Sequence, residues 1–108
     1  MEIPANIKED RRSWKRFDLL MKANYFLPKN TWYKECAIID ISRQGACIKT
    51  PAETDIRAGS SISLELFTKE IQSVNIKGII KWIKESEKGL IIGIKFNSAM
   101  DNKIYKNL

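Results

Sequence analysis

Short apolar segments alternate with polar turn residues along most of the chain, a pattern typical of β-strands. Six such segments are predicted, at residues 17–27, 31–41, 46–50, 61–67, 71–84 and 90–96. Within the fourth segment, Ile62, Leu64 and Leu66 alternate with polar neighbours, as in a strand with one buried face. Pro51 ends the third segment, and Gly78 offers a bend in the long fifth segment.

These segments predict an all-β fold, a six-stranded antiparallel β-barrel with a short C-terminal helix. Short polar turns favour antiparallel pairing, and closing the sheet into a barrel removes exposed strand edges. The end of the chain has a different pattern, because Ser98 followed by Asp101 is typical of a helix capping box. We expect the apolar residues of this helix to face the barrel end; they are Ile104, Tyr105 and Leu108.

The length of 108 residues predicts a single domain, since such a chain closes one modest core. We expect a flexible segment at 1–10, a basic ligand-binding lead at 11–16, the barrel at 17–97 and the helix at 98–108. No apolar run approaches the roughly 20 residues of a membrane helix, and no signal-type segment opens the sequence. We therefore expect a cytoplasmic protein that does not insert into membranes.

Half of the net charge of +6 is concentrated near the N-terminus, where five basic and two acidic residues lie between Lys8 and Arg16. One compact basic cluster fits a small anionic ligand better than a nucleic acid, which usually contacts a long basic face. The chain has no histidine, and its two cysteines, Cys36 and Cys47, are not spaced as a zinc pair. We expect no metal, no cofactor and no catalysis, and two half-buried strand thiols without a disulfide.

The basic cluster contains the motif R-x-x-x-R, formed by Arg12 and Arg16 and preceded by Arg11. Arginine forms paired hydrogen bonds with phosphate oxygens, and its planar group also stacks on bases. Positions 12 and 16 share a face on a helix and in an extended segment, so both arginines can converge on one ligand. Taken alone, the motif is better explained as a solvated basic stretch.

A second motif, D-x-S-x-x-G, lies between two predicted strands at Asp40, Ser42 and Gly45. The aspartate can accept hydrogen bonds from the donors of a guanine, and the serine hydroxyl can donate or accept. Arg43, inside the motif, could reach a phosphate or the guanine O6, and Gly45 permits a positive φ and close approach of a ligand. Taken alone, these residues are ordinary turn formers.

Together, in this order and within six strands, the two motifs resemble the PilZ domain. The segment Gly78–Trp82 is similar to the G-x-V-x-W strand of the family, with Ile80 in place of the usual valine. The segment Gly93–Phe96 is similar to its G-[VI]-x-F strand. The resemblance covers residues 11–108 and implies a barrel of the split-barrel type.

PilZ domains bind the bacterial second messenger cyclic di-GMP, and the resemblance implies the same ligand here. In the family, the arginines hold phosphate and stack on guanine, while the D-x-S-x-x-G turn contacts a guanine edge. The resemblance places these roles on the matching positions, which are Arg12, Arg16, Asp40, Ser42 and Gly45.

Three further residues have expected roles that the two motifs do not assign. Arg11 is an extra cation beside the motif that could hold a second, stacked copy of the dinucleotide, giving two ligands per chain. Trp82 is expected to be a core residue because it lies inside a strand, with a position beside a guanine at the barrel rim as the alternative. Trp14 is expected to touch the ligand or to anchor the lead.

The sequence therefore predicts a non-enzymatic cyclic di-GMP receptor. Ligand binding would order the basic lead against the barrel near residues 40–45, and a protein partner of unknown identity would respond to that change. Two alternatives stay open. One is a PilZ-like adaptor that acts through protein contacts without nucleotide. The other is a small basic barrel for single-stranded nucleic acid, which would be expected to interleave aromatic and basic residues on adjacent strands.

Overall fold

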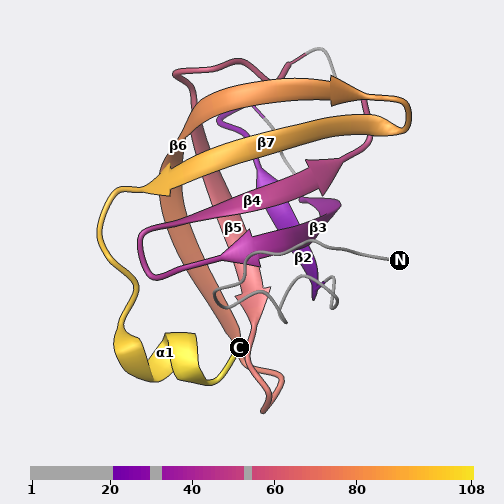
Figure 1. The fold of residues 1–108 in the computed structure, drawn as a ribbon. Helices are drawn as coiled ribbons and strands as arrows, with labels where there is room; N and C mark the ends of the chain where they lie inside the picture. The colour runs from indigo at the N-terminus through magenta and orange to yellow at the C-terminus, as the bar shows by residue number, and fades with distance from the viewer. Residues whose placement is uncertain (1–20, 30–32, 53–54) are drawn as a thin grey trace, which may run out of the picture.

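A computed structural model describes residues 21–29, 33–52 and 55–108 of the chain. The described part forms one closed barrel, with strands in the order β2-β3-β4-β7-β6-β5 and antiparallel pairing throughout. The six-stranded antiparallel barrel predicted from the sequence is confirmed, and a short helix follows it (Figure 1). The elements are β2 Met21–Phe26, β3 Lys34–Ile41, β4 Gly45–Thr50, β5 Ser61–Phe67, β6 Ser73–Ser86, β7 Gly89–Phe96 and α1 Asn102–Lys106.

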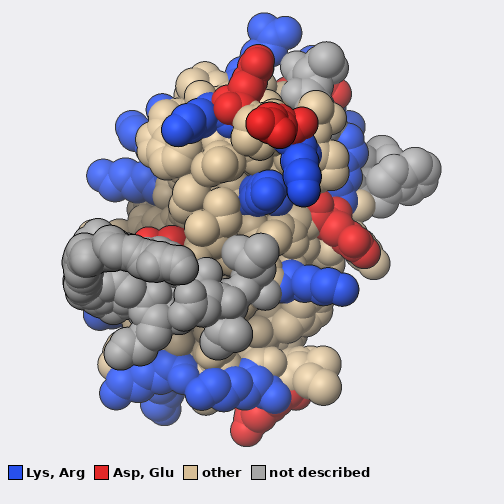
Figure 2. All heavy atoms as spheres, turned by 45° about the vertical axis from the view of Figure 1, so that its right-hand side comes forward, with Lys and Arg blue, Asp and Glu red and all other residues tan. Residues whose placement is uncertain are grey.

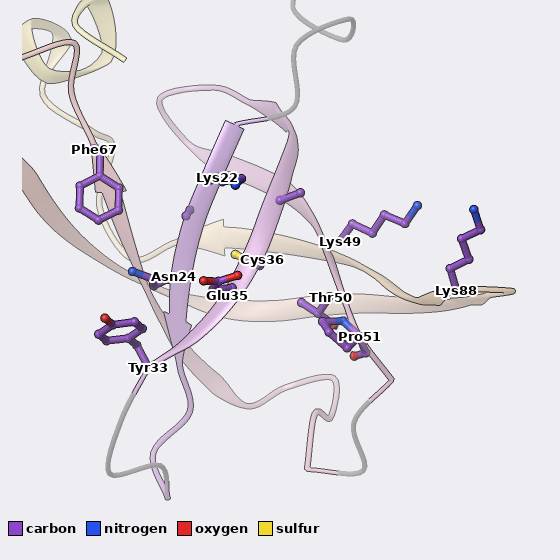
Figure 3. A pocket seen from close by; sticks show the side chains of 12 residues that line it. Lys22, Asn24, Tyr33, Glu35, Cys36, Lys49, Thr50, Pro51, Phe67 and Lys88 are labelled. Carbon is purple, nitrogen blue, oxygen red and sulfur yellow. Dashed lines mark hydrogen bonds between the residues drawn. The ribbon is translucent and has the colours of Figure 1, made fainter. Parts of the chain in front are cut away.

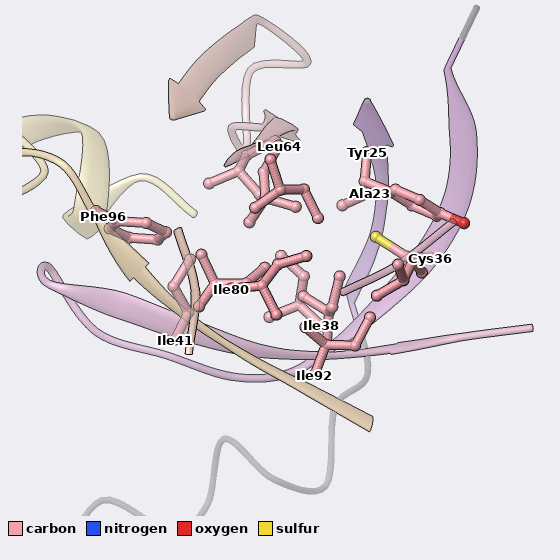
Figure 4. Packing of buried hydrophobic residues seen from close by; sticks show 14 of the residues in the cluster. Ala23, Tyr25, Cys36, Ile38, Ile41, Leu64, Ile80, Ile92 and Phe96 are labelled. Atoms are coloured by element: carbon pink, nitrogen blue, oxygen red, sulfur yellow. The ribbon is translucent and has the colours of Figure 1, made fainter. Parts of the chain in front are cut away.

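The core is one cluster of buried apolar side chains to which all six strands contribute (Figure 4). Strand β5 shows the principle, because Ile62, Leu64 and Leu66 are at most 2% exposed while their neighbours face outward. Burying each such side chain stabilises the fold by about 1.5–3 kcal/mol relative to exposure. The alternating apolar residues of β5 therefore stabilise the barrel through their burial in the core.

The predicted strand limits agree best with the structure at β4 and β5. The predicted strand 61–67 is confirmed, and β4 ends before Pro51 as expected. Residues 17–20 and 31–32 of the first two predicted strands lie outside the described residues. The prediction that the fifth strand starts at Ile71 is wrong. Ile71 closes a turn by donating its N–H to the Thr68 carbonyl at 2.8 Å, with a φ of 62°, so β6 begins at Ser73.

The long strand β6 is irregular, but not at the predicted place. Gly78 pairs in register with β5 and β7, so no bulge lies at this residue. The register shifts instead between Ile80 and Trp82, where β6 has one residue more than β7. A second shift lies between Ile38 and Asp40, where β3 pairs with β4. Such β-bulges bend a strand and redirect the side chains that follow.

The C-terminal helix α1 starts later than the sequence suggests. Its N-cap is Asp101, whose carboxylate accepts the N–H of Lys103 at 2.7 Å, so the predicted cap at Ser98 is wrong. The reason is that Met100 is buried and donates its N–H to the Arg43 carbonyl, which keeps the preceding segment against the barrel. No helix among the described residues is long and apolar enough to cross a membrane. As predicted, three apolar residues at this end pack against the core; they are Ile104, Tyr105 and Leu108.

Candidate functional site

The structure describes only part of the predicted site. Arg11, Arg12 and Arg16, together with Trp14, lie outside the described residues, and their roles stay predictions. The predicted site residues that are described are Asp40, Ser42, Arg43, Gly45 and Trp82.

Two of the predicted residues lie at opposite ends of one row that crosses four neighbouring strands. Asp40 on β3 pairs with Cys47 on β4, Cys47 pairs with Gly93 on β7, and Gly93 pairs with Trp82 on β6. Directly paired residues share one face of a sheet. With strands about 4.8 Å apart, the row spans about 14 Å between its end backbones. Residues distant in sequence thus form one continuous strip on the barrel surface.

The two bulges bring the ends of this row to the outer face. Ile38 and Ile80 are at most 1% exposed, so in regular strands the residues two positions later would also point inward. Each bulge adds a residue in between and reverses that direction. Trp82 is 48% exposed, so the expectation that it belongs to the core is wrong. Asp40 is half-buried beside a fully buried neighbour, Ile41.

Gly93 makes room for the tryptophan. The indole of Trp82 lies over strand β7, where a Cβ on Gly93 would overlap its Cε2 and Nε1 atoms. Any larger residue at position 93 would therefore displace the ring. The glycine of the second family-like strand and the tryptophan of the first are thus two parts of one contact.

An open groove of about 230 Å³ lies along this row and brings four of the predicted site residues together. They are Asp40, Ser42, Gly45 and Trp82. The groove is also lined by Cys47 and Lys81, which the sequence analysis did not assign to the site. One signal for Cys47 was available, because residues two apart in a strand share a face and Gly45 was already a candidate.

Ser42 shapes the turn at one end of the groove. Its hydroxyl accepts the N–H of Gln44 at 3.2 Å, and its own N–H donates to the Gly45 carbonyl at 2.9 Å. Such local bonds are the reason that serine is common in turns. The hydroxyl also donates to the Gly45 carbonyl at 3.4 Å, and the side chain is exposed, so one lone pair of its oxygen can still accept a hydrogen bond. Ser42 therefore serves as a turn former while facing the groove.

Gly45 is required for a reason other than the expected one. It belongs to strand β4 and is not among the glycines with positive φ. A Cβ at this position would instead overlap the carbonyl oxygen of Ile94 on the adjacent strand β7. The glycine thus permits close approach of two strands beside the groove.

Arg43 points to the C-terminal segment. Its Nε donates to the Met100 carbonyl at 2.7 Å, and the Met100 N–H donates to the Arg43 carbonyl at 2.6 Å. The hydroxyl of Tyr105 donates to the Ile41 carbonyl at 3.4 Å. Arg43 does not line the groove, so the structure does not bring it together with the other predicted site residues.

The thiol of Cys47, at the centre of the row, is a neutral group at ordinary pH. Its pKa is raised by burial and, to a lesser degree, by the negative charge of Asp40. Burial raises the pKa of the second thiol, Cys36, to about 12. Both cysteines are free, and Cys47 is half-buried as predicted, but Cys36 is buried in the core, so the expectation of two half-buried thiols is wrong for Cys36. A protonated thiol is a weak donor and a poor nucleophile, so Cys47 gives the groove a neutral, unreactive lining residue.

A second, larger concavity of about 570 Å³ contains none of the predicted site residues. Tyr33 and Phe67 line one side of it, and Lys49 and Lys88 extend along the other (Figure 3). On the face in Figure 2, the described lysine and arginine side chains form separate groups with acidic groups among them. That distribution differs from the continuous basic face that nucleic acids usually contact.

A comparison with known protein families matches almost the whole chain. The family model described as PilZ domain matches residues 10–108, a span that contains both sequence motifs and the whole cross-strand row. A comparison with curated proteins gives no match.

Proposed function

Since the chain belongs to the PilZ domain family, a family of cyclic di-GMP-binding and not catalytic domains, we propose that it is a receptor that binds this dinucleotide in the groove over β3, β4, β7 and β6. The observation that carries the proposal is the shared groove of Asp40, Ser42 and Trp82. It combines a carboxylate and a hydroxyl, which can hydrogen-bond a guanine edge, with an exposed aromatic ring, on which a base can stack.

In the proposed complex, a guanine lies in the groove with its donor edge toward Asp40. The carboxylate accepts charge-assisted hydrogen bonds, which contribute about 1.5–3 kcal/mol each. Ser42 adds a further hydrogen bond, and the ring of Trp82 stacks on or beside the base for about 1–3 kcal/mol. Micromolar affinity corresponds to about 8 kcal/mol, so the base contacts need support from the phosphates.

Arg12 and Arg16 provide that support in the proposal, by forming paired hydrogen bonds with the phosphates. Binding orders the basic lead over the groove, and Arg11 holds a second, stacked dinucleotide, giving two ligands per chain. The lead and the turn of Ser42 then present a new surface, to which a protein partner responds. Arg43 acts here as a positioning residue that fixes the turn through Met100.

Titration calorimetry of the whole chain with cyclic di-GMP tests the proposal. We expect micromolar or tighter binding, with affinity at least about tenfold lower in Arg16→Ala and in Asp40→Asn, because each loses a charge-assisted contact. Arg57→Ala is a matched control, since Arg57 is exposed and does not line the groove. Wild-type affinity in Arg16→Ala would contradict the assignment, and a saturating ratio of one would contradict the second ligand.

The same preparation separates the alternatives. Fluorescence anisotropy with a labelled single-stranded oligonucleotide should give weaker binding than cyclic di-GMP. Tighter binding of the oligonucleotide would replace the proposal with a nucleic-acid function. A folded chain that binds neither ligand would be an adaptor acting through protein contacts.

A further inference from the structure

The bulge in β6 places a lysine beside the exposed tryptophan. Ile80 points into the core, and in a regular strand Lys81 would face outward and Trp82 inward. The extra residue leaves Lys81 and Trp82 both exposed, opposite the single residue Gly93. Both side chains line the same groove. The irregular backbone thus presents an aromatic ring and a cation together, from consecutive positions.

Among the described residues, the groove has one acidic and one basic side chain, and they lie on different strands. Asp40 lies on β3, Lys81 lies on β6, and the thiol of Cys47 between them is protonated. The two charges therefore mark opposite ends of a strip about 14 Å wide at the backbone. A ligand with hydrogen-bond donors at one end and negative charge at the other fits this arrangement.

Building on the proposed function, we propose that Lys81 binds a phosphate of the dinucleotide whose guanine lies at Asp40. The base then stacks by Trp82, and a phosphate on the ribose of the same nucleotide contacts the ammonium group of Lys81. Lysine suits this place because its flexible stem carries a compact charge with three donors. Lys81 would act in addition to the arginines of the lead, and from the fixed barrel.

Lys84 provides a matched control on the same strand. It is also an exposed lysine, but its pair with Ile91 lies two positions along the barrel from the pair of Trp82 and Gly93, and it does not line the groove. Any effect of lowering the net charge of the protein would be shared by both lysines. A specific phosphate contact belongs to Lys81 alone.

The test is calorimetry with cyclic di-GMP on the whole chain, comparing wild type with Lys81→Ala, Lys81→Arg and Lys84→Ala. We expect affinity about tenfold lower in Lys81→Ala, the loss of one charge-assisted contact, and near wild type in the other two. Raising the salt concentration should weaken the wild type more than Lys81→Ala, because salt screens the missing ion pair. Melting temperatures without ligand should be alike in all four proteins.

The possible failures are distinguishable. If the wild type does not bind cyclic di-GMP, the proposed function is wrong and this inference falls with it. If the wild type binds and Lys81→Ala binds equally well, Lys81 is a solvated surface residue and only this inference is wrong. An equal loss in Lys84→Ala would show a general charge effect and would also overturn it.

Discussion

The two sides of the barrel follow different structural rules. Strand β5 pairs with β6 over seven successive positions without a register shift, and its buried and outward residues alternate throughout. Where β3 meets β4 and where β6 meets β7, the register shifts once in each pair. The described motif residues all lie on this second, bulged side, around Asp40 and Trp82.

The difference teaches how one strand can serve both packing and binding. A regular strand has one inward and one outward set of residues, so a core residue and a ligand-binding residue two positions apart would compete for the same face. The bulges between Ile38 and Asp40 and between Ile80 and Trp82 remove that competition. The regular side stabilises the fold. On the bulged side, one interruption of the register in each of two strand pairs turns the site residues outward.

The largest expected effect is on the regular side. Leu64→Ala removes a side chain that is 1% exposed in the core of β5, and it should lower the free energy of unfolding by about 2–5 kcal/mol. Chemical denaturation in urea measures the change. The affinity of the remaining folded protein for cyclic di-GMP should be nearly unchanged. A strong loss of affinity without a loss of stability would contradict the division between the two sides.

On the bulged side, Trp82→Ala should show the opposite balance. Losing the ring should weaken cyclic di-GMP binding by about 1–3 kcal/mol, the value of stacking on one base. The free energy of unfolding should change by less than about 1 kcal/mol, because half of the side chain is already exposed. Calorimetry and urea denaturation on one preparation measure both. Trp82→Phe, which keeps an aromatic face, should retain most of the affinity.

On the bulged side, the two thiols compare the core with the groove by reactivity, since Cys36 belongs to the core and Cys47 lines the groove. Only the thiolate is alkylated, and the pKa of both thiols is raised, so the rate with iodoacetamide should be low at pH 7 and rise with pH. Cys47 should react faster than Cys36, whose pKa of about 12 and burial protect it. Asp40→Asn removes a negative charge and should speed the reaction of Cys47 at a given pH.

Mass spectrometry of alkylated peptides follows each thiol separately. Saturating cyclic di-GMP should slow Cys47 and leave Cys36 unchanged, since only Cys47 lines the groove. Equal protection of both thiols would indicate general stabilisation and not occupation of the groove.

The smallest expected effect concerns the turn between β5 and β6 on the regular side, where one residue has a strained backbone conformation. Ile71 has a φ of 62° and is 83% exposed, and the left-handed conformation costs a residue of its kind about 1–2 kcal/mol. Ile71→Asn should therefore raise the free energy of unfolding by about 0.5–1 kcal/mol, since asparagine tolerates this conformation. Thermal melting measures it. Lys69→Asn, in the same turn at negative φ, should bring no such gain.

The sequence predicts the barrel because apolar alternation and turn residues are local signals. The limits of β5 follow directly from Ile62, Leu64 and Leu66, and the gathering of Asp40, Ser42 and Gly45 follows from their place in one short motif. The roles of the arginines before residue 20 stay predictions, since they lie outside the described residues.

The rest of the site depends on the two β-bulges, for which the neighbouring sequence gives no signal. Neither bulged strand has a glycine at its bulge, and the extra residues, Ile39 and Lys81, are ordinary strand residues. Period-two reasoning therefore sends Trp82 into the core and leaves Lys81 unnoticed. The start of α1 at Asp101 likewise depends on a tertiary contact, the docking of Met100 on the turn.

The paired hydrogen bonds between Arg43 and Met100 have a consequence for thermodynamic linkage. The same three-residue turn faces the groove through Ser42 and holds the segment that leads into α1. Linkage between two equilibria is reciprocal. If a ligand in the groove stabilises the turn in the conformation that holds Met100, it stabilises the docking of α1, and pulling α1 from the barrel then lowers the affinity for that ligand by the same free energy. A fluorescent reporter attached to this helix would therefore respond to ligand binding and would also change the affinity for the ligand.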